Sequence, residues 1–131
     1  MAPEISLGGN FVLDSIGQFY STTTIYGYIK RTECQISNET LLSILNSQLC
    51  WWYLVNTGTV LANGYYRYKP GYLKTFPIPI ISNNMDSLIQ EKVIKRINDP
   101  SSIQAIEKEI NQIIYEIYGL SIEEIGVVEN V

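Results

Sequence analysis

The pattern of apolar positions predicts helices in the C-terminal part of the chain. Isoleucines recur at alternating intervals of three and four residues, which places them along one helix face: Ile103, Ile106, Ile110, Ile113 and Ile117. Asp99 and Pro100 have the chemistry of a capping residue followed by a proline at the first helical position, and Gly119 is typical of a position just beyond a helix end. We therefore expect a helix over residues 99–118, preceded by a weaker amphipathic helix over residues 86–97.

Two further helices are predicted from capping residues. Ser121 precedes Glu124 by three positions, and this capping box predicts a short final helix. Either Ser37 or Asn38 can cap an earlier helix, in which Glu39 favours the first turn. Apolar side chains follow at helical spacing, so we expect one helix through Leu41, Leu45, Leu49 and Trp52.

The remaining segments favour extended structure. Residues 10–14 and 18–20 flank a turn signal, and residues 22–29 (TTTIYGYI) are rich in the β-branched and aromatic residues that strands prefer. Asn63-Gly64 is a strong hairpin signal. In the segment FPIPI at residues 76–80, two prolines one residue apart exclude a helix and favour an extended or edge position.

Together these signals predict an α+β fold. Residues 1–81 are expected to form a recognition part, made of a small mixed β-sheet with one packed helix. Residues 82–131 are expected to form a helical tail that packs on it, so that the whole chain is a single domain.

Charge is distributed unevenly along the chain. The net charge is −4, yet residues 1–81 hold five basic and four acidic side chains, whereas residues 82–131 hold four basic and nine acidic ones. Between Glu39 and Asp86 there is no acidic residue, and the basic residues there are Arg67, Lys69 and Lys74. Because the charges are segregated, an acidic protein of this kind is compatible with a surface that faces DNA.

The residues that several classes of catalytic site require are absent from the sequence. The chain has no histidine, which removes the usual general base, most nucleophilic triads and most zinc sites. Glu107 and Glu109 lie on the polar side of the isoleucine helix, where solvated charge is expected. Cys34 and Cys50 are expected to be reduced thiols of a cytoplasmic protein. We expect no catalytic residue and no metal site, and the chain has no apolar run long enough for a membrane span.

Residues with the chemistry of nucleic-acid contacts concentrate in residues 57–74. Arginine binds guanine and asparagine binds adenine through paired hydrogen bonds, lysines and hydroxyls contact phosphates, and tyrosines stack on bases or sugars. Arg67, which alternates with Tyr66 and Tyr68, is the best candidate for a side chain projecting from a strand. By composition alone, residues 57–74 are equally consistent with an ordinary strand surface that binds nothing. The predicted DNA contacts are Thr57, Thr59, Asn63, Tyr65, Arg67, Lys69 and Lys74, with Lys30 and Arg31 as further members.

The isoleucine helix allows two interpretations. It packs within its own domain, or it is an arm that docks on a partner or on a second copy and gives weak self-association. The second interpretation makes the chain a protein-interaction or dimerisation module, which is the alternative to DNA binding.

Three motifs, in this order along the chain, resemble one family. They are LLSILNSQL at residues 41–49, RYKPGYLKTFPIPI at residues 67–80 and YEIYGLSIEEI at residues 115–125. The sequence resembles the TaqI-like C-terminal specificity domain of type IIG restriction–modification enzymes and of related adenine-specific DNA methyltransferases. The resemblance runs over about residues 11–125.

The resemblance implies a target-recognition domain that selects double-stranded DNA for a parent enzyme in the prokaryotic cytoplasm. That parent would be an adenine-N6 methyltransferase, a restriction endonuclease or both. Its cofactor would be S-adenosylmethionine, and the resemblance does not decide whether the parent also uses Mg²⁺. The domain would contact the parent's methyltransferase domain, and residues 99–118 would be a spacer or supporting helix. The chain carries neither an adenine-holding nor a cofactor-binding motif, so it is not expected to be an enzyme by itself.

Overall fold

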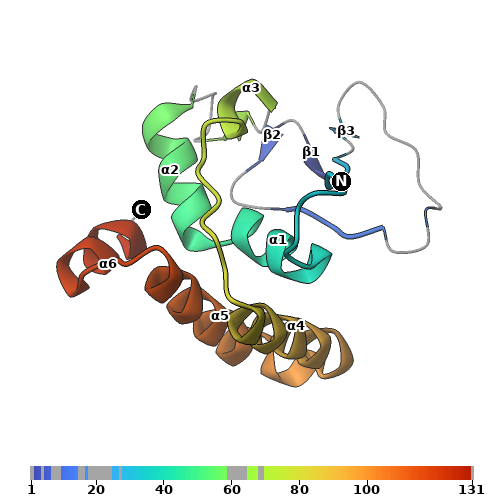
Figure 1. Ribbon diagram of the computed structural model, residues 1–131. Coiled ribbons are helices and arrows are strands. Elements are labelled where there is room, and N and C mark those ends of the chain that lie inside the picture. Colours follow the sequence, from blue (N-terminus) through green and yellow to red (C-terminus); the bar gives the residue numbers. More distant parts are fainter. Residues whose placement is uncertain are drawn as a thin grey trace.

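In the computed structural model, helices form most of the described structure (Figure 1). The structure describes residues 2–3, 5–6, 10–14, 17, 25–26, 28–58, 65–67 and 70–130. The helices in chain order are α1 (Asn38–Leu45), α2 (Gln48–Thr57), α3 (Pro70–Leu73), α4 (Asn83–Asn98), the 3₁₀ turn η2 (Pro100–Ser102), α5 (Ile103–Ile117) and α6 (Ile122–Glu129). Helix α1 packs against α4, and α2 packs against α5 and α6.

The predicted β-sheet is wrong. Strand pairing among the described residues is limited to two antiparallel ladders, each with two residues per strand. One joins β1 (Ala2–Pro3) to β3 (Ile25–Tyr26), and the other joins β2 (Ile5–Ser6) to β4 (Tyr66–Arg67). The β-branched and aromatic content of these segments permits extended backbone, but it does not require a sheet. The described part of the chain therefore has a helical fold and not the predicted α+β fold.

The structure gives a different outcome for each expected extended segment. Residues 10–14 are described without strand structure, and among the described residues of the segment 22–29 (25–26 and 28–29) Ile25 and Tyr26 lie in a strand. Residues 18–20 and the hairpin signal Asn63-Gly64 lie outside the described residues. Residues 76–80 form no helix, as their prolines predict.

The single helix expected after Ser37 is wrong, because the chain forms two. Ser37 caps α1 by accepting a hydrogen bond from the Thr40 amide at 3.1 Å. The helix ends at Asn46, and Ser47 then caps α2 by accepting from the Cys50 amide at 3.1 Å. The Ser47 hydroxyl also donates to the Ile44 carbonyl at 2.6 Å, which joins the two helices at the break.

The predicted end residues Asp99, Gly119 and Ser121 are confirmed, whereas α4 begins at Asn83, three residues before its expected start, with Ser82 as its cap. Asp99 caps the turn η2, in which Pro100 occupies an initial position, and α5 follows directly. Gly119 has φ +69°, its amide bonds to the Glu116 carbonyl at 3.0 Å, and this pattern closes the C-terminus of α5. Ser121 and Glu124 form the capping box of α6.

The isoleucine helix packs within its own domain. Ile106, Ile110 and Ile113 are buried in a core that α1, α2 and α4 share, and Ile114 on the same helix is fully buried. The first of the two interpretations of this helix is therefore confirmed. None of the helices in the described part of the chain is both long and apolar enough to cross a bilayer.

A hydrogen-bond cluster joins the N-termini of α1 and α4. The Asp86 carboxylate accepts hydrogen bonds from the Ser37 amide at 3.1 Å, from the Ser37 hydroxyl at 2.8 Å and from the hydroxyl of Thr40, which is fully buried. Partial burial would raise the pKa of Asp86, but the hydrogen bonds from Thr40 and Ser37, together with the charge of Lys30, lower the pKa below its usual value. This cluster fixes α4 on α1.

The two cysteines differ in burial, and this difference predicts their reactivity. Cys50 is fully buried and burial raises its pKa to about 12, whereas Cys34 is half-buried. At pH 8 only about one Cys50 thiol in 10⁴ is the reactive thiolate, so we expect Cys34 alone to react rapidly with iodoacetamide. Mass spectrometry of the labelled native protein measures this. Rapid labelling of Cys50 in a Cys34→Ser variant would contradict the buried position.

Candidate nucleic-acid interface

Two exposed residues follow α3 in a tight turn, which we call the Lys74 turn (residues 73–76). The Phe76 amide donates to the Leu73 carbonyl at 2.9 Å and closes the turn. Lys74 and Thr75 are its central residues and are exposed, whereas Leu73 and Phe76 are buried. The turn therefore presents an ammonium group and a hydroxyl group between two residues anchored in the core.

Aromatic side chains of two helices contact the Lys74 turn. The Phe76 ring lies between the Tyr53 ring of α2, at a centroid distance of 5.1 Å, and the Tyr118 ring at the end of α5, at 5.7 Å. The Tyr118 hydroxyl donates to the Pro77 carbonyl at 2.6 Å, and the Tyr53 hydroxyl shares a 2.6 Å hydrogen bond with Thr75. We call Tyr53, Phe76 and Tyr118 the aromatic clamp. It attaches the turn to two helices.

Thr57 ends α2 and is exposed. Its hydroxyl donates to the Tyr53 carbonyl at 2.7 Å, so toward a ligand it is available as an acceptor and not as a donor. Gly58 follows, and a β-carbon there would lie 2.7 Å from the Leu54 carbonyl oxygen. This end of α2 consequently requires glycine at residue 58.

The strand β4 contacts α2 through Tyr66. The Tyr66 and Trp51 rings meet edge to face with a centroid distance of 5.3 Å, and Tyr66 is partly buried, whereas Tyr65 is exposed. Arg67 pairs with Ile5 in the ladder, and its side chain lies outside the described part. The alternation of Tyr65 and Tyr66 agrees with one tyrosine in the core and one at the surface.

The two basic residues before α1 have different surroundings. Lys30 is half-buried, and its ammonium group donates to the Ile36 carbonyl at 2.6 Å. It also contributes to the low pKa of Asp86. Arg31 is exposed. Lys30 thus stabilises the approach to α1, and Arg31 is the better placed of the two for an external anion.

The remaining predicted contacts are not placed. Thr59, Asn63 and Lys69 lie outside the described residues. Among the described ones, Thr57 lies one helical turn of α2 from Tyr53, and the Tyr53 hydroxyl bonds to Thr75 of the Lys74 turn. Sequence patterns missed Tyr53, Thr75 and Tyr118. The one feature of the sequence that could have indicated Thr75 and Tyr118 is that they are hydroxyl-bearing residues within the motifs at residues 67–80 and 115–125.

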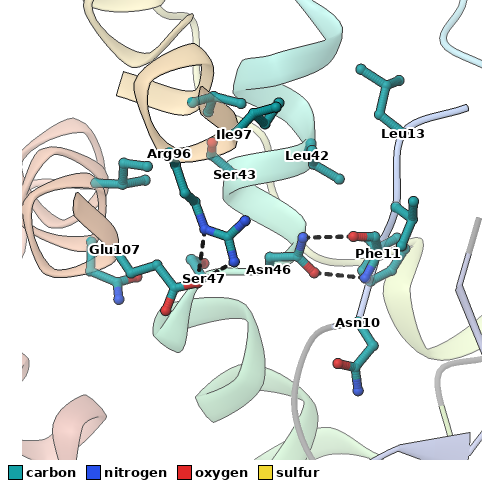
Figure 2. Close-up of a pocket in the computed structure, with 14 residues that line it drawn as sticks. Asn10, Phe11, Leu13, Leu42, Ser43, Asn46, Ser47, Arg96, Ile97 and Glu107 are labelled. Carbon is teal, nitrogen blue, oxygen red and sulfur yellow. Dashed lines mark hydrogen bonds and ion pairs between the residues drawn. The ribbon is translucent and has the colours of Figure 1, made fainter. Parts of the chain in front are cut away.

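A groove of about 550 Å³ lies elsewhere, between residues 10–13 and the helices α1, α4 and α5 (Figure 2). The side-chain amide of Asn46 binds the backbone of Phe11 twice: its oxygen accepts from the Phe11 backbone amide at 2.7 Å, and its nitrogen donates to the Phe11 carbonyl at 2.9 Å. Arg96 and Glu107 form an ion pair at 2.7 Å. These polar groups of the groove are engaged with one another, and the acidic α5 forms one wall, so the groove is a poor site for DNA.

The described residues offer no support for a catalytic pair at Glu107 and Glu109. Glu107 pairs with Arg96, and Glu109 pairs with Lys92 at 2.6 Å, where the bond and the charge of Lys92 lower the Glu109 pKa. No group of three or more potential metal-ligating side chains occurs in the part of the chain that is described. Both glutamates connect α5 to α4.

An exposed lysine and an exposed hydroxyl in one turn are compatible with several classes of binding module, of which nucleic-acid-binding modules are one. The comparison with protein families identifies which one: the chain belongs to the TaqI-like C-terminal specificity domain family, whose profile matches residues 1–78. Membership implies recognition of a DNA target in a restriction–modification context. The match ends before α4, so it is shorter than the resemblance over residues 11–125. Searches of curated proteins and of solved structures gave no significant match.

Proposed function

We propose that this chain is the sequence-specific target-recognition domain of a type II restriction–modification enzyme or adenine-specific DNA methyltransferase. The family match carries the proposal, and the exposed Lys74 turn supports a location for the contact surface. In this proposal double-stranded DNA contacts residues 57–74, with Arg31 at the edge of the surface.

The residues divide by chemistry between positioning and reading. Lys74, Lys69 and Arg31 contribute phosphate contacts, which orient DNA without selecting its sequence. Arg67 and Asn63 have the paired hydrogen-bonding groups that distinguish guanine and adenine in the major groove. Thr57, whose proton is donated to Tyr53, accepts from a base amino group.

The negative charge of α5 favours one orientation of the domain on DNA. In Figure 1, α3 and the C-terminal end of α2 lie at the end of the molecule opposite α4 and α5. Helix α5 carries three acidic side chains and one basic one, whereas α4 carries two acidic and three basic ones, of which Lys92 and Arg96 form ion pairs with acidic residues of α5. Repulsion from phosphates would turn α5 away from the duplex.

Catalysis and cofactors belong, in this proposal, to other domains of a parent enzyme. A methyltransferase domain would bind S-adenosylmethionine, and a cleaving parent would use Mg²⁺. This chain would contribute the choice of DNA sequence, and it would contact the methyltransferase domain.

Selection from a randomised duplex library at low salt tests the proposal. We expect the wild-type chain to enrich a defined sequence, and an Arg67→Ala/Lys74→Ala variant to lose that enrichment. The matched control is Lys95→Ala/Lys108→Ala, which removes the same charge from exposed positions of α4 and α5. Equal loss in both variants would show that only net charge matters. No enrichment by the wild-type chain at any salt concentration would exclude sequence reading by this chain.

A further inference from the structure

We propose that Tyr118, which caps the C-terminus of α5, and Tyr53 of α2 are positioning residues for DNA binding, because they hold the Lys74 turn in the conformation that contacts a phosphate. The inference rests on the proposed function and extends it to α5. The family match ends at residue 78, so Tyr118 lies outside it. The tail helix would then be part of the DNA-binding unit and not only a spacer.

The turn is closed and anchored at both ends, which fixes the backbone of its two exposed residues. Leu73 and Phe76 are 8% and 7% exposed, and the hydrogen bond between their backbones closes the turn. Lys74 and Thr75 lie between these anchors. They are adjacent in sequence, and an ammonium and a hydroxyl are the kinds of donor that a phosphodiester oxygen accepts.

Tyr118 fixes the segment immediately after the turn. Its hydroxyl donates to the Pro77 carbonyl across 41 residues of sequence, and its ring lies against Phe76. Burial raises the pKa of Tyr118 above its usual value, so the hydroxyl keeps its proton at physiological pH. Proline has no amide hydrogen, so its carbonyl is the one backbone group through which Pro77 can be held.

Tyr53 fixes the turn from the other side. Its hydroxyl and that of Thr75 lie 2.6 Å apart, and one of the two protons forms their shared bond. The other proton is left to be donated to a ligand. Within α2, the Tyr53 carbonyl also accepts a hydrogen bond from the Thr57 hydroxyl one helical turn later.

Preorganisation gives the size of the expected effect. A turn that has lost the bond to Pro77 must be ordered on binding, which costs an amount equivalent to about a two- to tenfold change in affinity. We expect Tyr118→Phe, which retains the ring and removes the bond to Pro77, to weaken DNA binding about fivefold. Because no charge is lost, the dependence of affinity on salt should remain as in the wild type.

Fluorescence anisotropy with a labelled duplex of mixed sequence, titrated at several salt concentrations, measures both quantities. Lys74→Ala should lower the salt slope by about one unit, since one phosphate contact is lost. Tyr118→Phe and Tyr53→Phe should leave the slope unchanged and raise Kd. The matched control is Tyr115→Phe, on the same helix, because the Tyr115 hydroxyl is buried beside Glu129 of α6 and not beside the Lys74 turn.

Amide hydrogen exchange of Phe76 gives a second readout that does not depend on DNA. It should accelerate in Tyr118→Phe and Tyr53→Phe, and stay unchanged in Tyr115→Phe. If Lys74→Ala lowers the salt slope while both clamp variants bind like the control, the positioning role is overturned and the DNA surface stands. If Lys74→Ala changes nothing, the location of the DNA surface fails, whatever the exchange rates show. Should Tyr118→Phe unfold, Tyr53→Phe still decides the question.

Discussion

Replacing Ile110 by aspartate should unfold the domain. Ile110 is 7% exposed and lies in the core that α5 shares with α2 and α4. An unpaired carboxylate there costs more than about 4 kcal/mol, which is comparable to the whole stability of a small domain. Circular dichroism at 25 °C should show loss of helix and of a cooperative thermal transition.

The matched control is Ile122→Asp, the same chemical change at an 85% exposed position in the first turn of α6. A carboxylate is tolerated near a helix N-terminus, so this variant should melt close to the wild type. The pair also tests the dimerisation alternative. A folded Ile110→Asp monomer obtained from a wild-type dimer would show that the isoleucine face docks on a second copy, contrary to its burial in this fold.

Replacing Asp86 by alanine should cost about 2–4 kcal/mol of unfolding free energy. The carboxylate receives bonds from the Ser37 amide and hydroxyl and from the buried Thr40 hydroxyl. Its removal leaves these donors without their partner at the junction of α1 and α4. Chemical denaturation in urea measures the loss. A change below about 0.5 kcal/mol would contradict the structural role.

The same residue should make the domain sensitive to acid. The pKa of Asp86 is lower in the folded state than in the unfolded chain, so its stabilising contribution is complete above about pH 4 and is lost as the pH falls through the folded-state pKa. In Asp86→Asn this part of the pH dependence should disappear. Asp99→Asn is the comparison at an exposed cap, and its effect on the unfolding free energy should be the smaller of the two.

The helix ends were predictable because their chemistry is local. Ser37, Asp99-Pro100, Gly119 and the Ser121–Glu124 box each act within about four residues of sequence, so the pattern of residue types is sufficient. The isoleucine spacing likewise identified the buried face of α5. The division of the chain at residue 81 stays a prediction.

The failures involve partners far apart in sequence. The break between α1 and α2 occurs where the Asn46 side chain binds the Phe11 backbone, 35 residues away. Helical spacing continues across the break, so apolar periodicity could not reveal it. The predicted sheet failed because strand propensity describes how a residue fits a pleated surface and does not establish that such a surface exists.

From the sequence the candidate site could be proposed as a region and not as an arrangement, and DNA contact by residues 57–74 stays a prediction. The polar and aromatic composition of residues 57–74 and the resemblance indicated where to look. They could not indicate that Tyr118 reaches Pro77, since nothing local to either residue encodes the contact. The roles of Arg67 and Lys69 in binding DNA stay predictions.

The arrangement of the Lys74 turn bears on how a domain of this kind could change its overall affinity for DNA. Leu73 and Phe76 are buried and Lys74 is exposed, so a substitution at Lys74 should change the unfolding free energy by no more than about 0.5 kcal/mol. The strength of DNA binding can then change during evolution while the domain stays folded.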